Sequence, residues 1–401
     1  MLRLAVAVAS LYIHFPWCLA KCPYCDFVSY ATEREDIDHV GYADAVIREA
    51  EGRARYLETH RPEACAVSTI FLGGGTPSLW EPSEIARVLA RLRALFDVDR
   101  DAEITAECNP TSLDHARATA LIHAGVNRLS VGTQSLRAEQ LRFLGRLHDP
   151  QGAERAVRAA LATGARVSTD LIFGLPDQSV ADAVSQAEAL AELGLKHLSC
   201  YQLTIEPGTQ FGERRKRGLL PMADDGDVAE AFLAIDEALE RRGLHHYEIS
   251  NYAADAEQAR HNLAYWRGDE YIGLGCGAFG FVRQGTGGIR WRNALIPADY
   301  IARTACTRSD VLGEGDGVAI HHEVLSGEML LRERIMLGLR LAEGLDLSRA
   351  GSELGINPWT TERTRSIDTL ITKHRLLRDG DMVRIPRQAW LFADDTAARL
   401  F

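Results

Sequence analysis

The sequence has too little positive charge and too short an apolar start for several common classes of protein. Its 401 residues carry a formal net charge of −11. That balance argues against a general nucleic-acid-binding protein, which needs an excess of Lys and Arg to neutralise phosphates. The apolar start, Met1 to Val8, is far too short to span a bilayer and leaves no room for a signal-peptide cleavage site before the next strand-like run. We therefore predict mature sequence in the cytoplasm.

The chain also lacks the cysteine content of a disulfide framework and any low-complexity linker. It has eight cysteines, and thiols of a cytosolic protein stay reduced. Hydrophobic content of 46% and charged content of 25% are ordinary for a globular protein, long enough for one large domain and a small one. Five cysteines are scattered, and most of them fit as small core residues: Cys65, Cys108, Cys200, Cys276 and Cys306.

The other three cysteines stand close together, with Cys18, Cys22 and Cys25 at spacings of four and three. A flexible loop with this spacing can wrap three thiolates around one face of an iron–sulfur cluster. A cube of four irons held by three cysteines keeps one iron open, which indicates a cluster that acts on a bound molecule. Chance clustering and a Cys₃His zinc site completed by His14 remain alternatives.

Strand-like and helix-like segments alternate after the cysteines. The strand candidates are residues 10–15, 67–72, 103–106, 128–131, 167–172 and 197–202. The helix candidates are residues 34–58, 82–96, 113–123, 151–162 and 180–193. Such alternation predicts an α/β fold of βαβ units with a parallel sheet, and about six units make an open or partial barrel.

Polar and glycine-rich positions recur where these strands end. The cysteines follow the first strand and the run Gly73-Gly74-Gly75-Thr76 follows the second, where the missing side chains would let backbone N–H groups approach a ligand. Glu107 ends the third strand, Gln134 follows the fourth and Asp170 lies within the fifth. Because active-site groups of barrel enzymes collect at the carboxyl ends of the strands, we expect these features to meet at one rim.

The run over residues 12–27, Tyr-Ile-His-Phe-Pro-Trp-Cys through Cys-Asp-Phe, resembles the radical S-adenosylmethionine (SAM) superfamily. Within it, the run is similar to the branch that holds the heme chaperones HemW and the oxygen-independent coproporphyrinogen III oxidases HemN. The resemblance implies a partial (β/α)6 TIM-like barrel with a small C-terminal winged-helix-like α+β domain. It also implies a [4Fe–4S] cluster on Cys18, Cys22 and Cys25, whose electron cleaves bound SAM to a 5′-deoxyadenosyl radical.

The resemblance further implies which residues hold SAM, and it assigns no catalytic side chain. The chemistry of the matching positions fits, because Arg grips a carboxylate as a fork and Asp or Gln bonds ribose hydroxyls. The implied SAM contacts are Tyr12, Tyr24, Gly74, Gly75, Thr76, Glu107, Gln134, Arg146, Asp170 and Phe279.

Three features favour a heme chaperone of the HemW type over the oxidase. Phe27 stands where the oxidase type has a fourth cysteine, and only 17 residues precede Cys18, whereas the oxidase has a long N-terminal extension. Residues 261–266, His-Asn-Leu-Ala-Tyr-Trp, resemble a HemW signature linked with heme. We call them the signature segment.

His is a common axial ligand of heme iron, so His261 is predicted to contact heme together with Tyr265 and Trp266, with Cys276 as a competing ligand. The glycine-rich residues 273–280 that follow mimic a dinucleotide fingerprint. We reject that interpretation, since no clear strand precedes them and no helix pattern follows.

The remaining predictions concern domains and partners. We expect a barrel over residues 1–245, an extension over 246–325 that is irregular at 296–323, and a C-terminal domain over 326–401. That domain has nearly equal numbers of basic and acidic residues, so no nucleic-acid partner is expected.

The resemblance implies transfer of heme to apo-hemoproteins, a reductant for the cluster, a homodimer, and a peripheral position at the membrane during delivery. The alternatives are a coproporphyrinogen III oxidase, a radical SAM enzyme with another substrate, and a zinc protein.

Overall fold

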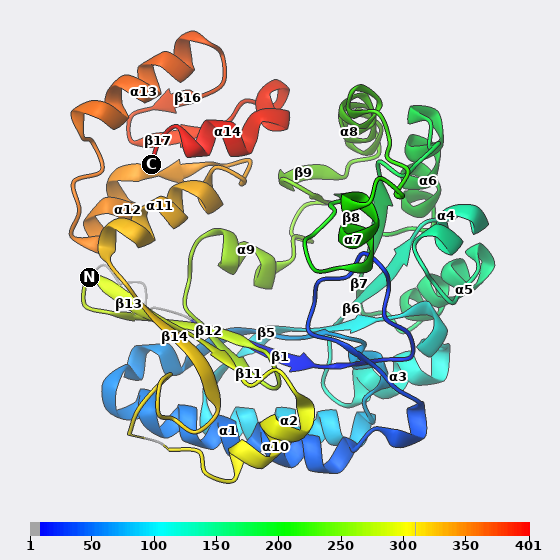
Figure 1. Cartoon of the computed structure of the whole chain (residues 1–401), viewed down its shortest axis with the longest axis vertical. Coiled ribbons are helices and arrows are strands. Elements are labelled where there is room, and N and C mark those ends of the chain that lie inside the picture. Colours follow the sequence, from blue (N-terminus) through cyan, green and yellow to red (C-terminus); the bar gives the residue numbers. More distant parts are fainter. Residues whose placement is uncertain (1–8, 309) are drawn as a thin grey trace.

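The computed structural model describes residues 9–308 and 310–401, so the predicted role of Met1 to Val8 lies outside the described residues. Within this part, a twelve-stranded sheet organises the chain in the order β14-β13-β12-β11-β1-β4-β5-β6-β7-β8-β10-β9 (Figure 1). Its strands are β1 (Ala9–Phe15), β4 (Ala66–Gly74), β5 (Asp97–Cys108), β6 (Arg128–Gln134), β7 (Arg166–Phe173), β8 (His197–Gln202), β9 (His245–Glu248), β10 (Asn251–Ala253), β11 (Tyr271–Leu274), β12 (Phe279–Gln284), β13 (Gly287–Asn293) and β14 (Ala319–Leu325).

The centre of the sheet is parallel, from β11 through β1 to β8, and antiparallel strands extend both edges. Each central strand from β1 onward leads into a helix, which confirms the predicted α/β fold of six β/α units. These helices are α1 (His39–His60), α2 (Pro82–Leu95), α3 (His115–His123), α4 (Ala138–Phe143), α5 (Pro150–Leu161), α6 (Val180–Glu192) and α8 (Asp225–Glu240).

Local sequence explains where these helices begin. The side chain of Asp38 accepts a hydrogen bond from the Gly41 N–H at the start of α1, and Asp149 and Ser179 cap α5 and α6 in the same way. Such caps satisfy N–H groups that have no partner inside the helix. Helix α1 begins five residues later than the sequence pattern predicts, at His39, because the preceding residues form a short 3₁₀ turn and an Asp38 cap.

The two faces of the sheet differ. Phe15 of β1 points toward the helix layer, where it packs against Tyr42 of α1 and Trp80. Since side chains alternate along a strand, Tyr12 and His14 point to the opposite, concave face. There the ring of Tyr12 lies 6.2 Å from that of Phe71 on β4. Helix α9 (Arg260–Trp266) packs on this concave face, between the sheet and the C-terminal domain (Figure 1).

The C-terminal domain has its own core of apolar residues and a three-stranded sheet. Its elements are α11 (Gly327–Gly338), β15 (Leu345–Asp346), α12 (Leu347–Leu354), α13 (Thr361–Thr372), β16 (Leu377–Asp379), β17 (Met382–Arg384) and α14 (Ala393–Ala398). The winged-helix-like pattern of helices and a short sheet is present, and α14 is an addition that the sequence pattern did not predict. Phe281 of β12 and Leu325 of β14 belong to the same core, so the domain packs on the extension of the large sheet.

Two local predictions are wrong. Residues 296–323 are not irregular throughout, since they contain α10 (Pro297–Thr304) and most of β14. A strand does precede the glycines of the dinucleotide-like stretch, because β11 ends at Leu274 and pairs with β1. A second strand, β12, follows instead of a helix, so the rejection of a dinucleotide-binding unit stands. Over the described residues, every helix is too short or too polar to cross a bilayer.

Candidate functional site

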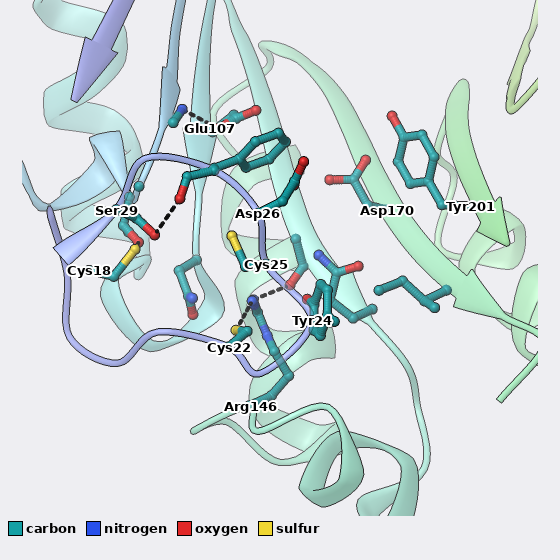
Figure 2. A pocket seen from close by; sticks show the side chains of 18 of the residues that line it. Cys18, Cys22, Tyr24, Cys25, Asp26, Ser29, Glu107, Arg146, Asp170 and Tyr201 are labelled. Atoms are coloured by element: carbon teal, nitrogen blue, oxygen red, sulfur yellow. Dashed lines mark hydrogen bonds between the residues drawn. The ribbon is translucent and has the colours of Figure 1, made fainter. Parts of the chain in front are cut away.

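The three clustered cysteines lie on one loop at the carboxyl end of β1. The short strands β2 (Trp17–Cys18) and β3 (Tyr30–Ala31) pair in parallel and close the base of this loop. Lys21 ties it together by donating from Nζ to the carbonyl oxygens of Phe27 and Ser29, at 3.1 and 3.2 Å. Figure 2 shows the Cys18, Cys22 and Cys25 side chains on this loop, where all three face one cavity.

This cavity measures about 520 Å³ and lies where the central parallel strands end. The predicted convergence at one rim is therefore present: the cysteine loop, the glycine run, Glu107, Gln134 and Asp170 all line it. Figure 2 labels Glu107 and Asp170 around the three cysteines. The predicted SAM contacts that line it are Tyr24, Gly74, Gly75, Thr76, Glu107, Gln134, Arg146 and Asp170.

Tyr12 and Phe279 are not among the residues that line the cavity. The Tyr12 hydroxyl lies 3.0 Å from His14 Nδ1 on the concave face of β1. Phe279 begins β12 and is 41% exposed, with the Arg292 guanidinium carbon 4.8 Å from its ring centre. Their assignment to SAM thus has no support from the walls of this cavity.

The glycine run does not offer its N–H groups to a ligand, so that part of the prediction is wrong. The Gly74 N–H donates to Glu107 Oε2, the Gly75 N–H to the Phe15 carbonyl and the Thr76 N–H to the Trp17 carbonyl. Gly74 has φ +108°, and a Cβ on Gly75 would lie 2.6 Å from the Trp17 carbonyl oxygen. The glycines are needed for this close packing. A ligand that meets the loop backbone can use only carbonyl oxygens, which suits an ammonium group.

Two carboxyl groups, those of Glu107 and Asp170, line the same cavity, and burial raises the pKa of both. Burial, together with the nearby Asp170 charge, raises the pKa of Glu107 to about 8. Burial also raises the pKa of Asp170 to about 6, against a hydrogen bond from Ser199 that lowers it. Groups whose pKa is shifted by burial and a like charge in a cavity are typical of functional sites. A bound cation would relieve both penalties.

Arg146 and Gln134 also line the cavity. Arg146 donates from Nη2 to the Gly132 carbonyl at 2.7 Å and from Nη1 to Cys22 Sγ at 3.5 Å. Its buried Nε has no hydrogen-bond partner among the described residues. Gln134 ends β6 with φ +67°, a strained conformation for a residue with a side chain. Such strain at the rim of a cavity is typical of a ligand-binding position.

The donor set fits a cluster better than a zinc ion. Within the part of the chain that the structure describes, no three His, Cys, Asp or Glu side chains converge closely enough for one metal ion. Both nitrogens of His14 are taken, Nδ1 by the Tyr12 hydroxyl and Nε2 by the Val28 carbonyl at 2.7 Å. The Cys₃His zinc alternative is therefore wrong. A cube needs no common centre, since each thiolate binds its own iron.

The surroundings of Cys18 disfavour its free thiolate. Burial raises the pKa of the Cys18 thiol to about 11, against a hydrogen bond from the Thr76 hydroxyl at 3.3 Å that lowers it. Without a metal the thiol is protonated at neutral pH, and metal binding must displace that proton.

Sequence reasoning missed part of the cavity wall. Tyr201 and Gln202 end β8, so the strand-end rule that found Glu107 would have found them too. The other missed polar positions carry no comparable signal, because they lie in loops or within a strand: Asp26, Ser29, Asn109, Ser130, Thr204 and Glu206.

The signature segment forms α9 and is closed in by the fold. His261 is 2% exposed, and burial lowers its pKa to about 3. Its Nδ1 lies 2.8 Å from Thr69 Oγ1 and its ring stacks on Phe71 at 4.9 Å. Its Nε2 has no hydrogen-bond partner among the described residues, but burial keeps it from an external iron as the structure stands.

The other predicted heme contacts pack against protein side chains, although Tyr265 and Trp266 are only half-buried and Tyr265 lines a second cavity of about 200 Å³. The Tyr265 ring meets His261 and Tyr271 edge-on, at 5.0 and 4.7 Å between ring centres. The Arg340 guanidinium carbon lies 5.7 Å from the Trp266 ring centre. The competing ligand, Cys276, is buried with its thiol directed at the Leu295 carbonyl, 2.6 Å away.

Comparisons with known proteins agree with this architecture. The profile of the Radical SAM superfamily matches residues 12–190, and that of the HemN C-terminal domain matches residues 325–392. The heme chaperone HemW of Escherichia coli is 43% identical over 300 residues, 75% of this chain and 74% of that protein. HemW of Mycobacterium tuberculosis is 33% identical over 387 residues, 96% of this chain and 93% of that protein.

Two further relatives extend the comparison. The mitochondrial radical S-adenosyl methionine domain-containing protein 1 of Danio rerio is 39% identical over 342 residues, 84% of this chain and 74% of that protein. The solved structure of the coproporphyrinogen III oxidase HemN from Escherichia coli has a TM-score of 0.80 at 21% identity, covering 98% of this chain and 90% of that one. The chain therefore belongs to the radical SAM superfamily, in the branch of HemW and HemN.

Proposed function

We propose that this protein is a heme chaperone of the HemW type, which binds a [4Fe–4S] cluster, SAM and heme and transfers the heme to acceptor hemoproteins. The observation that carries the proposal is the set of relatives named heme chaperone HemW, 33% to 43% identical. The oxidase with the same fold is only 21% identical. Phe27, at the position of the oxidase's fourth cysteine, supports the same choice.

In this proposal Cys18, Cys22 and Cys25 hold the cluster. When bound, such a cluster supplies single electrons to the sulfonium of SAM. The chain's own residues tune the thiolates: the Thr76 hydroxyl donates to Cys18 and Arg146 donates to Cys22. Hydrogen bonds to the sulfurs stabilise the charged form and shift the potential of a cluster.

SAM would occupy the rest of the cavity. Carbonyl oxygens of Gly74 and Gly75 and the Glu107 carboxylate would accept from its ammonium group. Arg146 would supply positive charge for its carboxylate, and Gln134 and Asp170 would bond the ribose. Tyr24 would contribute a buried aromatic wall. These residues position the ligand and exclude water, which is the protein's part in cofactor chemistry.

The remaining predictions enter as parts of the same proposal. We propose a cytoplasmic protein, peripheral at the membrane when it delivers heme, with a reductant for the cluster as a partner and a homodimer as its assembly. Barrel, extension and C-terminal domain would divide at residues 245 and 325. No nucleic-acid partner is expected.

The test is heme transfer by the anaerobically reconstituted protein. The protein is loaded with hemin, separated from free hemin and mixed with an apo-hemoprotein whose absorbance changes on heme uptake. Transfer faster than from free hemin at equal concentration is the expected result. Conversion of coproporphyrinogen III to protoporphyrinogen IX without heme transfer would instead identify an oxidase.

A further inference from the structure

Three side chains form a row across the extension of the large sheet. Phe279 on β12 pairs with Arg292 on β13, and Arg292 pairs with His321 on β14. Directly paired residues of antiparallel strands point to the same face. Since Phe281, two residues along β12, pairs with Tyr271 beside the concave face of β1, the row also points to the concave side. We call these three residues the sheet row.

The sheet row is accessible and lies beside the cysteine loop. Phe279 is 41% exposed and His321 is exposed. The Tyr30 hydroxyl donates to the Leu295 carbonyl, just after β13, and a Cβ on Gly277 would touch Val28. These contacts join the loop to the turns around the row. Phe27, 57% exposed, also lines the cavity.

Within residues 9–308 and 310–401, Arg292 is a cation without a counter-charge. No carboxylate within 4.0 Å and no hydrogen-bond acceptor partners its guanidinium among the described residues, and its Nε is buried. Two residues earlier on the same face, Arg290 is paired with Glu323 and Glu333. A half-buried guanidinium that stacks on Phe279 and lacks an anion indicates a place for an external carboxylate.

We propose that the sheet row is the heme-docking surface, with His321 on the iron, Arg292 on a propionate carboxylate and Phe279 against the edge of the macrocycle. This inference rests on the proposed function. It supplies an exposed imidazole where the signature segment offers only a buried one. Arg292 and His321 lie on neighbouring strands, about 5 Å apart. The Arg292 guanidinium leans away from His321 toward Phe279, so it would reach the rim of a macrocycle centred over His321.

Heme suits this surface better than a simple anion does. A free phosphate or carboxylate would use Arg292 alone and would need neither the imidazole nor the aromatic ring. Heme combines an iron that takes His, a flat apolar ring and carboxylates at one edge. The surface also lies beside the cavity of the cysteine loop, which brings the cargo next to the proposed cluster and SAM.

The test is a hemin titration of the full-length, anaerobically reconstituted protein, followed by its absorbance spectrum. His321→Ala is expected to weaken binding about tenfold or more and to change the spectrum of the ligated iron. His322→Ala is the matched control, since it lies on the opposite face of the same strand, and it should bind like the wild type. Arg292→Gln should weaken binding about fivefold, and that effect should vanish with heme dimethyl ester, which lacks free carboxylates.

The outcomes separate this inference from the proposed function. Wild-type affinity and spectrum in His321→Ala, with loss of binding only in His261→Ala, would overturn the docking surface but leave heme transfer intact. An Arg292→Gln effect of equal size with the ester would overturn the carboxylate contact. A wild-type protein that binds no hemin would remove both proposals.

Discussion

The cysteine loop and the signature segment are equally conspicuous in the sequence, but the fold treats them in opposite ways. The loop follows a parallel strand at its carboxyl end, so its three thiols face an open cavity. The signature segment forms a helix on the concave face, where His261 is 2% exposed and stacked on Phe71. Position relative to the strand ends, rather than residue type, thus decides which motif can meet a ligand.

The largest expected effect is complete loss of the cluster when Cys22 is changed to Ser. A hydroxyl is a poor ligand for iron, and two remaining thiolates do not hold a cube. The reconstituted wild type should retain about four irons per chain, measured with acid-labile sulfide, and the variant none. Cys306→Ser, an exposed cysteine outside the cavity, should assemble the cluster normally. A Cys22→Ser protein that still holds four irons would show that Cys22 is not a ligand of the cluster.

Next in size is the loss of stability when His261 is changed to Ala. The change leaves a cavity under α9, removes the hydrogen bond to Thr69 and leaves that buried hydroxyl with one partner fewer. We expect a decrease of about 2–4 kcal/mol in the free energy of unfolding, measured in urea. His115→Ala, exposed at the start of α3, serves as the control and should change it by less than about 0.5 kcal/mol. Equal stability of both variants would show that the His261 side chain is not packed between α9 and the sheet.

The sequence predicts the frame of this site better than its details. The alternation of strands and helices predicts a parallel sheet, so the sequence alone assigns Glu107 and Asp170 to one rim, where both line the cavity. Strand β14 escaped prediction because His321, His322 and Glu323 interrupt any apolar alternation. Arg146 was found only by resemblance, since it lies between helices and not at a strand end.

Other properties depend on contacts that no pattern encodes. The glycine run was expected to present N–H groups, but Glu107 accepts from the Gly74 N–H, and the Phe15 and Trp17 carbonyls accept from the next two. Burial of His261 follows from packing of α9 against β4, which are far apart in sequence. That the Nε of Arg292 lacks a partner among the described residues is likewise visible only once its neighbours are in place.

Burial shifts the pKa of Glu107 at the cavity and of His261 in the signature segment. Only Glu107 should respond to SAM, because only it lines the cavity. Glu107 has a pKa of about 8 instead of 4.5, so its carboxyl is largely protonated at pH 7 in the free protein. A cationic ligand favours the ionised form and lowers that pKa. Binding therefore releases a proton, and affinity rises as the pH increases from about 6 to 8 and levels off above that.

Calorimetric titration of the reconstituted protein with SAM in buffers of different ionisation enthalpy measures this proton release. We expect an increase in affinity of about tenfold between these pH values. Glu107→Gln should bind more weakly at pH 8 and lose most of the dependence on pH. His261, whose pKa of about 3 lies below this range, contributes nothing to it. A dependence that persists in Glu107→Gln would assign the titration to another group.

Two arginines on β13 show the same contrast: Arg290 is paired with carboxylates, whereas Arg292, two residues later, has no ion pair among the described residues. Arg290 donates to Glu333 at 2.5 and 3.0 Å and to Glu323 at 3.0 Å, so Arg290→Gln should lower the free energy of unfolding by about 1–2 kcal/mol. Arg292 has no ion pair to lose among the described residues, and Arg292→Gln should change it by less than about 0.5 kcal/mol. Urea unfolding of both variants measures the difference. Equal destabilisation would mean that Arg292 is held by the protein itself, and its guanidinium would then not be free for a carboxylate from outside.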